Sequence, residues 1–137
     1  MTAAVSARTR DEDGSGGPLA GKRILVVEDE PIIAMAIEDM LGELGCIAVG
    51  PALRLADAER LAASERLDAA VLDVNMGEGP SFAVAELLRS RGVAICFSTG
   101  YGASGVDETF ASAPVVQKPY RIDALEAALV RAIAAGG

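Results

Sequence analysis

Short apolar runs alternate along this chain with stretches whose apolar residues recur at helical spacing. The first run, RILVV at residues 23–27, is typical of a strand buried on both faces. The helical spacing that follows is carried by Ile33, Ile37, Met40, Leu41 and Leu44. Pro31 fits the first turn of this helix, and Gly45 fits a left-handed residue just after its end. The pattern predicts a strand followed by a helix.

The same pattern repeats through the rest of the chain. Further strands are predicted at 46–49, 69–72, 93–97 and 114–117. Further helices are marked by Leu55, Ala58, Leu61 and Ala62, by Val84, Leu87 and Leu88, and by Ile122, Leu125, Leu129 and Ile133. A weak helical signal at 106–110 predicts a short, mobile fourth helix. Five strands alternating with helices predict a doubly wound α/β domain, a five-stranded parallel sheet with helices on both faces.

Residues 1–20 differ from the rest in composition. They are rich in Gly, Ser, Thr and charged residues and show no apolar period, which predicts a disordered leader. The remaining residues, 21–137, have the length of one globular domain.

The charge balance limits the choice of partners. A formal net charge of −8 disfavours nucleic acids and anionic membranes. No apolar run approaches the roughly 20 residues of a membrane span, and the first residues lack the apolar segment of a secretory signal. We therefore expect a cytoplasmic protein. Cys46 and Cys96 lie in apolar surroundings and are predicted to be buried, inert thiols.

Polar side chains follow most of the predicted strands, where ligands bind in such folds. They are Glu28, Asp29, Glu30, Asp73, Asn75, Ser98, Thr99 and Lys118. If the first strand lies beside the third, three carboxylates converge, and pairs about 4 Å apart repel by several kcal/mol. A cation would make this tolerable. With only oxygen ligands at these positions and no His in the chain, the pattern favours Mg²⁺.

Asp73 is the candidate nucleophile in this group. A carboxylate that faces a metal-bound phosphoryl group can form an aspartyl phosphate. Mg²⁺, the Lys118 ammonium and the Thr99 hydroxyl would neutralise the transferred group from three directions. Because the chain has no His, it is excluded as a phosphohistidine donor.

Four stretches, ILVVEDEP, VLDVNMG, FSTGYG and VVQKPY, resemble in order and spacing the signature stretches of response-regulator receiver domains. The resemblance covers about residues 22–135. It implies the flavodoxin-like strand order 2-1-3-4-5. It also implies a signalling role rather than an enzymatic one, limited to self-phosphorylation and autodephosphorylation.

The resemblance assigns roles to individual residues. Asp73 is the expected phosphoacceptor, Asp29 a direct Mg²⁺ ligand and Glu28 a water-mediated one, while Asn75 would contribute its backbone carbonyl.

The resemblance also assigns the switch, the residues that are expected to move in response to phosphorylation. Thr99 is the expected switch hydroxyl and Lys118 the phosphate-binding cation, with a cis peptide bond before Pro119. Ordinary receivers carry an aromatic switch residue where this chain has Val115, so we expect Tyr101 to take that role.

FSTGYG is also similar to the F-A-T-G-Y stretch of a subgroup of single-domain receivers in alphaproteobacteria, often paired with unorthodox histidine kinases. This chain departs from that subgroup at Ala94 and Ile95, where Pro-Phe is usual, and at Ser98, where Ala is usual.

The resulting hypothesis is a stand-alone response regulator. It would accept a phosphoryl group from a sensor histidine kinase or a histidine phosphotransferase, and would signal to a downstream protein by contact. One alternative is a pseudo-receiver that is never phosphorylated and acts only by binding. Another is a Mg²⁺-dependent phosphatase or phosphotransferase of the haloacid dehalogenase or toprim kind, which would need a second acid where this chain has Asn75.

Overall fold

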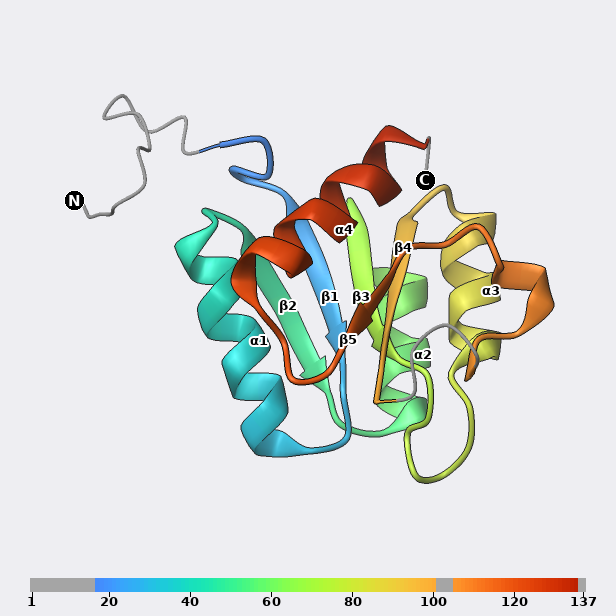
Figure 1. Ribbon diagram of the computed structural model, residues 1–137. Helices are drawn as coiled ribbons and strands as arrows, with labels where there is room; N and C mark the ends of the chain where they lie inside the picture. The colour runs from blue at the N-terminus through green and yellow to red at the C-terminus, as the bar shows by residue number, and fades with distance from the viewer. Residues whose placement is uncertain (1–16, 101–104, 136–137) are drawn as a thin grey trace.

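The computed structural model describes residues 17–100 and 105–135. Its strands form one parallel sheet of order β2-β1-β3-β4-β5 (Figure 1). The strands are β1 (Arg23–Val27), β2 (Ile47–Ala52), β3 (Ala69–Asp73), β4 (Ala94–Thr99) and β5 (Val115–Gln117). The predicted parallel sheet and its strand order are confirmed.

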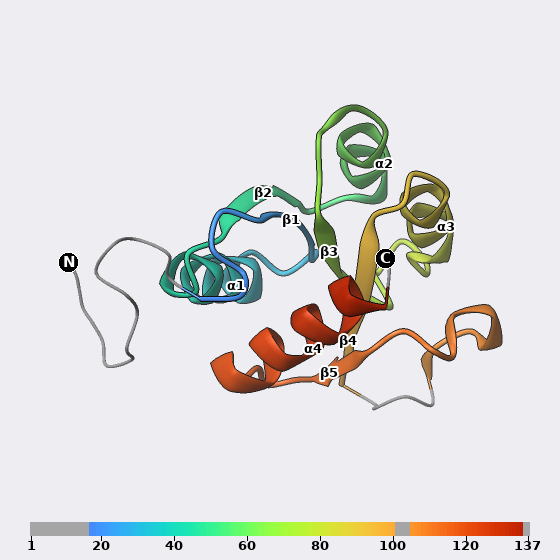
Figure 2. The same ribbon diagram turned by 90° about the horizontal axis from the view of Figure 1, so that it is seen from above.

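Helices pack on both faces of this sheet. They are α1 (Pro31–Glu43), α2 (Leu55–Ser64), α3 (Phe82–Ser90) and α4 (Ile122–Ala134). Helices α1 and α4 cover one face, and α2 and α3 cover the other (Figure 2). Within the described ranges, none of the helices is long and apolar enough to cross a membrane.

The boundaries of α1 are the predicted ones. The helix begins at Pro31, and the chain leaves it through Gly45 with φ +83°. A left-handed residue just past the helix end is the position that glycine favours.

Two predicted elements differ in extent. Strand β2 continues past residue 49 to Ala52, with a register shift against β1 between Leu25 and Val27. The shift lies opposite Pro51, which an edge strand tolerates at such an irregularity. The predicted helix at 106–110 is only a 3₁₀ turn, Glu108–Phe110, in which the Asp107 side chain accepts from the Thr109 N–H at 2.8 Å.

Apolar side chains fill both faces of the sheet, because successive strand residues point in opposite directions. Leu25, Leu72 and Phe97 belong to the core under α2 and α3. Val26 and Cys96 belong to the core under α1 and α4. Burial on both faces explains why the strands have continuous apolar runs.

All three phenylalanines of the chain meet in one cluster. Phe82 opens α3, Phe97 lies in β4 and Phe110 lies in the 3₁₀ turn, and their ring centroids are 5.6–5.8 Å apart. The Arg89 guanidinium covers the Phe110 ring at 4.4 Å, a cation–π contact. The cluster fixes the segment before β5 against α3 and β4.

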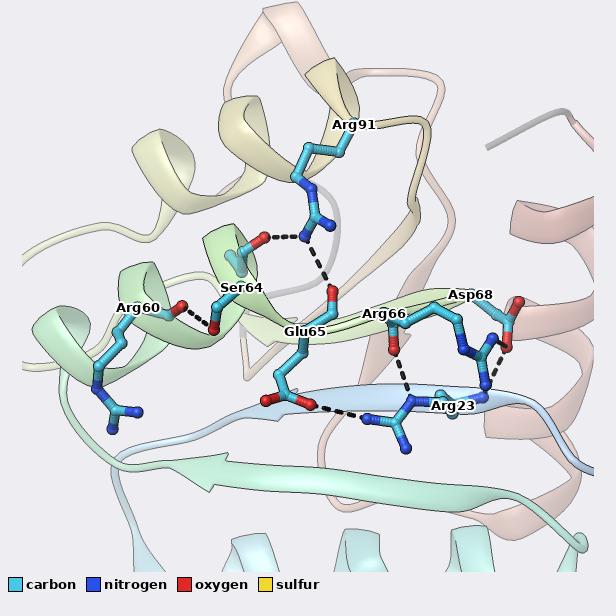
Figure 3. Close-up of polar contacts among 8 residues, drawn as sticks. Arg23, Arg60, Ser64, Glu65, Arg66, Asp68 and Arg91 are labelled. Carbon is cyan, nitrogen blue, oxygen red and sulfur yellow. Dashed lines mark hydrogen bonds and ion pairs between the residues drawn. The ribbon is translucent and has the colours of Figure 1, made fainter.

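Arginines organise the amino end of the sheet (Figure 3). The Arg23 side chain donates to the Arg66 carbonyl at 2.6 Å and pairs with the Glu65 carboxylate at 2.8 Å. Arg91 donates to the carbonyls of Ala62 and Glu65, groups at the end of α2 that lack partners within the helix. The network joins the loop after α2 to β1 and to the end of α3.

Both cysteines are buried free thiols, as predicted. Burial raises the pKa of Cys46 to about 11 and that of Cys96 to about 12. Thiols with such pKa values stay protonated and are poor nucleophiles.

The domain begins earlier than the predicted boundary at residue 21. Leu19 is 1% exposed and belongs to the core under α1 and α4. Its carbonyl accepts from the Cys46 thiol at 3.5 Å, and the Gly21 N–H donates to the Gly45 carbonyl at 2.8 Å. Assigning residues 17–20 to a disordered leader was therefore wrong, because one leucine anchors them; residues 1–16 lie outside the described ranges.

We predict that Leu19→Ala lowers the free energy of unfolding by about 2–4 kcal/mol, the usual cost of emptying a buried leucine site. Denaturant titration measures this. Leu53→Ala is the matched control, because Leu53 is 36% exposed, and its loss should stay below about 1 kcal/mol. Equal small losses in both variants would show that Leu19 is not part of the core.

Candidate functional site

The carboxyl ends of β1 and β3 lie side by side, which brings the predicted acids together. Val27 pairs with Leu72, so Glu28 follows β1 next to Asp73, the last residue of β3. Carboxylate oxygens of Glu28, Asp29 and Asp73 lie within 4.8 Å of one another. Glu28 has no exposed surface and Asp73 is 6% exposed, so water screens their repulsion weakly.

Lys118 supplies a positive charge next to these acids. Its ammonium lies 3.1 Å from Glu28 Oε1 and 3.3 Å from Asp73 Oδ2. The backbone N–H of Lys118 donates to the Thr99 carbonyl at 3.0 Å, which fixes Lys118 to the end of β4. The Lys118–Pro119 bond is cis, as the sequence resemblance implied.

Burial governs the charge states of this group. It raises the pKa of Glu28 to about 7, and the Asp73 carboxylate adds to the shift. Burial also raises the pKa of Asp73, although the Lys118 ammonium opposes the increase. For Lys118, burial lowers the pKa, but Asp73 and Glu28 outweigh it and raise the pKa above its usual value. One ammonium thus pairs with two of the three clustered carboxylates.

The loop after β3 is folded tightly around the acids. The Ser81 hydroxyl donates to the Asp73 carbonyl at 2.7 Å, and the Asn75 side chain accepts from the Gly77 N–H at 3.0 Å. Gly77 has φ +82°, and a Cβ atom there would lie 2.8 Å from Asp29 Oδ2. Only glycine fits this position without displacing the acid.

Two side chains that position this loop were missed by sequence reasoning. One is the buried Ser81, and the other is Glu78, which accepts from the Leu55 N–H at 2.8 Å and pairs with Arg54 at 2.9 Å. Glu78 acts across 23 residues, and Ser81 acts across eight, which is more than a turn spans, so no turn or helix pattern indicates them. The serine directly before the apolar face of α3 was the one available signal.

The remaining predicted residues lie at the end of β4. Thr99 is buried and pairs in register with Gln117 of β5. Ser98, also buried, pairs with Asp73. Asn75 is exposed at the start of the loop after β3. Tyr101, the predicted switch aromatic, lies outside the described residues.

A family model described as the response regulator receiver domain matches residues 24–130. The chain belongs to this family. Membership agrees with the strand order, the acid cluster and the position of Lys118 after β5.

Individual relatives support this receiver assignment. The phyllosphere-induced regulator PhyR of Methylorubrum extorquens is 34% identical over 95 residues, which are 65% of this chain and 36% of PhyR. The chain thus spans about a third of that relative. The solution structure of SdrG from Sphingomonas melonis Fr1 is 41% identical, with 83% of this chain and 97% of SdrG covered and a TM-score of 0.74.

A third relative concerns the metal. The receiver domain of the sensor histidine kinase PA1611 from Pseudomonas aeruginosa PAO1 is 28% identical, with 84% of this chain and 99% of that domain covered and a TM-score of 0.70. Its crystal structure has a magnesium ion coordinated in the active-site cleft.

The acids of this receiver domain suit the same kind of ion. All three offer oxygen, and two of them are buried with raised pKa values that a nearby cation would lower. A hard divalent cation with room for water ligands fits such a partial oxygen set.

We predict that the metal-free domain loses stability as the pH rises from about 4.5 to about 7. Because the folded-state pKa of Glu28 exceeds its unfolded value, the folded state binds the extra proton, and its advantage is lost through that window. The change is roughly 2–3 kcal/mol. Denaturant titrations in EDTA at pH 5 and pH 8 measure it.

Glu28→Gln should remove most of this pH dependence and be more stable than the wild type at pH 8, whereas Glu59→Gln on exposed α2 surface should behave as the wild type. A wild type equally stable at both pH values would contradict the charge-state assignment.

Proposed function

We propose that this receiver domain accepts a phosphoryl group on Asp73 from a sensor histidine kinase or a histidine phosphotransferase. The observation that carries the proposal is the surroundings of Asp73: the Lys118 ammonium lies 3.3 Å from its carboxylate, and oxygens of two further carboxylates lie within 4.8 Å. An acceptor carboxylate needs both an anchor for the phosphoryl oxygens and a place for a cation.

The transfer step uses the Asp73 carboxylate as nucleophile. One of its oxygens attacks phosphorus while the bond from phosphorus to the donor imidazole nitrogen breaks, and the bonding pair returns to that nitrogen. The product is an acyl phosphate. Lys118, already 3.3 Å from Asp73, stabilises charge on the phosphoryl oxygens, and the Thr99 hydroxyl contributes from the end of β4.

Mg²⁺ would be held by Asp29, Asp73 and the backbone carbonyl of Asn75, with Glu28 acting through water. When bound, the ion supplies charge neutralisation between the acids and the phosphoryl group. The Asx turn at Asn75 and the glycine at position 77 keep the loop close to Asp29.

The two alternative functions fit the site less well. A pseudo-receiver that only binds a partner does not need a half-buried lysine paired to two buried carboxylates, an arrangement with a desolvation cost. A phosphatase of the haloacid dehalogenase kind uses a second acid two residues after the nucleophile, where Asn75 stands.

We expect Asp73→Asn to abolish phosphorylation by acetyl phosphate and Mg²⁺ while the domain stays folded, because an amide cannot attack phosphorus. Intact mass spectrometry detects the phosphoryl adduct, and EDTA should prevent its formation. Asp57→Asn on α2 is the matched control and should react as the wild type. An adduct on the Asp73→Asn variant would reject the site, and an unreactive wild type would favour the pseudo-receiver.

Signalling would proceed by contact with other proteins. Ile32 and Met35, one turn apart on α1, are 81% and 59% exposed. Ile32 also lines an apolar pocket that extends to Lys118 and Pro119 beside the acids. Exposed apolar surface next to the acceptor suits a phosphodonor protein, which must approach this edge to deliver its group.

The proposed switch consists of Thr99 and Tyr101. Val115 pairs with Phe97 in the sheet and is half-buried, and its short side chain cannot swing as an aromatic one would. In this proposal, Thr99 moves toward the phosphorylated Asp73 and Tyr101 repacks, which prepares the segment before β5 for a partner.

Tyr101→Ala should leave phosphorylation of Asp73 largely intact but reduce the response of the segment before β5. The measurement compares amide chemical shifts with and without beryllofluoride, a phosphoryl mimic, in the wild type and in Tyr101→Ala. Val115→Ala is the control and should respond as the wild type. Equal shifts in all three proteins would remove Tyr101 from the switch.

A further inference from the structure

Three buried side-chain oxygens in the described part of the chain lack a hydrogen-bond partner: Glu28 Oε1, Ser98 Oγ and Tyr120 Oη. Glu28 Oε1 has the Lys118 ammonium at 3.1 Å as an ion-pair partner, which leaves acceptor capacity on this oxygen. Buried polar atoms are nearly always paired, since an unpaired one costs about 1–3 kcal/mol. Three such atoms therefore require an explanation.

The sheet register places these oxygens on one face. Asp73 pairs with Ser98 across β3 and β4, so both side chains point to the same side. Val26 and Val71 belong to the core under α1 and α4, and Glu28 and Asp73, each two residues later, point to that side as well. Tyr120 packs against the same core. Glu28, Asp73 and Ser98 thus form a row across adjacent strands, with Tyr120 on the same face.

The electrostatic surroundings of Tyr120 agree with this placement. Burial raises the pKa of its phenol, the Ser98 hydroxyl lowers it, and the carboxylates of Glu28 and Asp73 raise it. The phenol therefore stays protonated and can donate a hydrogen bond. Ser98 is fully buried, so its hydroxyl has no access to bulk water.

The donors and acceptors of the three groups match. Ser98 and Tyr120 each carry one hydroxyl proton, and Glu28 Oε1 accepts. We propose that Ser98 and Tyr120 are positioning residues that hold the Glu28 carboxylate toward the Mg²⁺ site, through a hydrogen-bonded chain closed directly or by one buried water molecule. The inference rests on the proposed function, because it assigns Glu28 to the metal.

The test measures Mg²⁺ binding by NMR titration of the full chain in the wild type, Tyr120→Phe, Ser98→Ala and the double variant. Loss of a group that orients a ligand typically weakens metal binding by 10-fold or more, so each single variant should bind about 10-fold more weakly. The double variant should be no weaker than a single one, because either change breaks the chain. Ser64→Ala, which removes an exposed hydroxyl on α2, should bind as the wild type.

Unfolding of the metal-free proteins gives a second, independent reading. If the hydroxyls are paired, removing either one leaves the melting temperature unchanged or lowers it. If they are unpaired, their removal raises it, because a buried unsatisfied group is lost.

The outcomes separate the two proposals. Wild-type Mg²⁺ affinity in either single variant, or a higher melting temperature in both, would overturn the positioning role while leaving phosphorylation of Asp73 in place. A wild type that binds no Mg²⁺ would overturn the proposed function and this inference with it. Tyr120→Phe differs by one oxygen atom, so it remains informative if Ser98→Ala does not fold.

Discussion

Repulsion among buried carboxylates is the constraint on which the rest of this receiver domain depends. Glu28 and Asp73 lie almost without solvent access beside Asp29, and within the described residues Lys118 is the one cation that forms ion pairs with them. The excess of negative charge disfavours the fully ionised, metal-free state. The same excess suits the site to a divalent cation, so the electrostatic cost and the proposed chemistry have the same origin.

The two ends of the sheet differ in how their charges are paired. At the amino end, Arg23 and Arg91 satisfy carbonyls and carboxylates in an orderly network. At the carboxyl end, the negatively charged acids lie together with few positively charged partners. The apolar core on both faces and the arginine network hold the strand ends in place despite that repulsion.

Most of the fold follows from local sequence patterns, because strands buried on both faces must be continuously apolar. The periodicity of the sequence does not determine the strand order, which came from the receiver resemblance. Only with that order could the sequence predict that the acids after the first and third strands lie close together. Leu19 escaped prediction because a single apolar residue among Gly, Pro and Ala has no period. Glu78 escaped because its partner is 23 residues away, and Ser81 escaped because its bond closes an irregular loop of eight residues that has no sequence signature. Residues 108–110 form a short turn instead of the predicted helix because the tertiary contacts of Phe110 outweigh the weak local preference for a helix.

The phenylalanine cluster has a consequence for local unfolding. Phe82 directly follows Ser81, which holds the Asp73 carbonyl, and Phe97 lies two residues before Thr99. Since the rings pack on one another and on Phe110, neither segment can open without exposing the aromatic surface of the other. We therefore expect the loop after β3 and the end of β4 to open as one cooperative unit, with their amides exchanging with solvent through a shared opening.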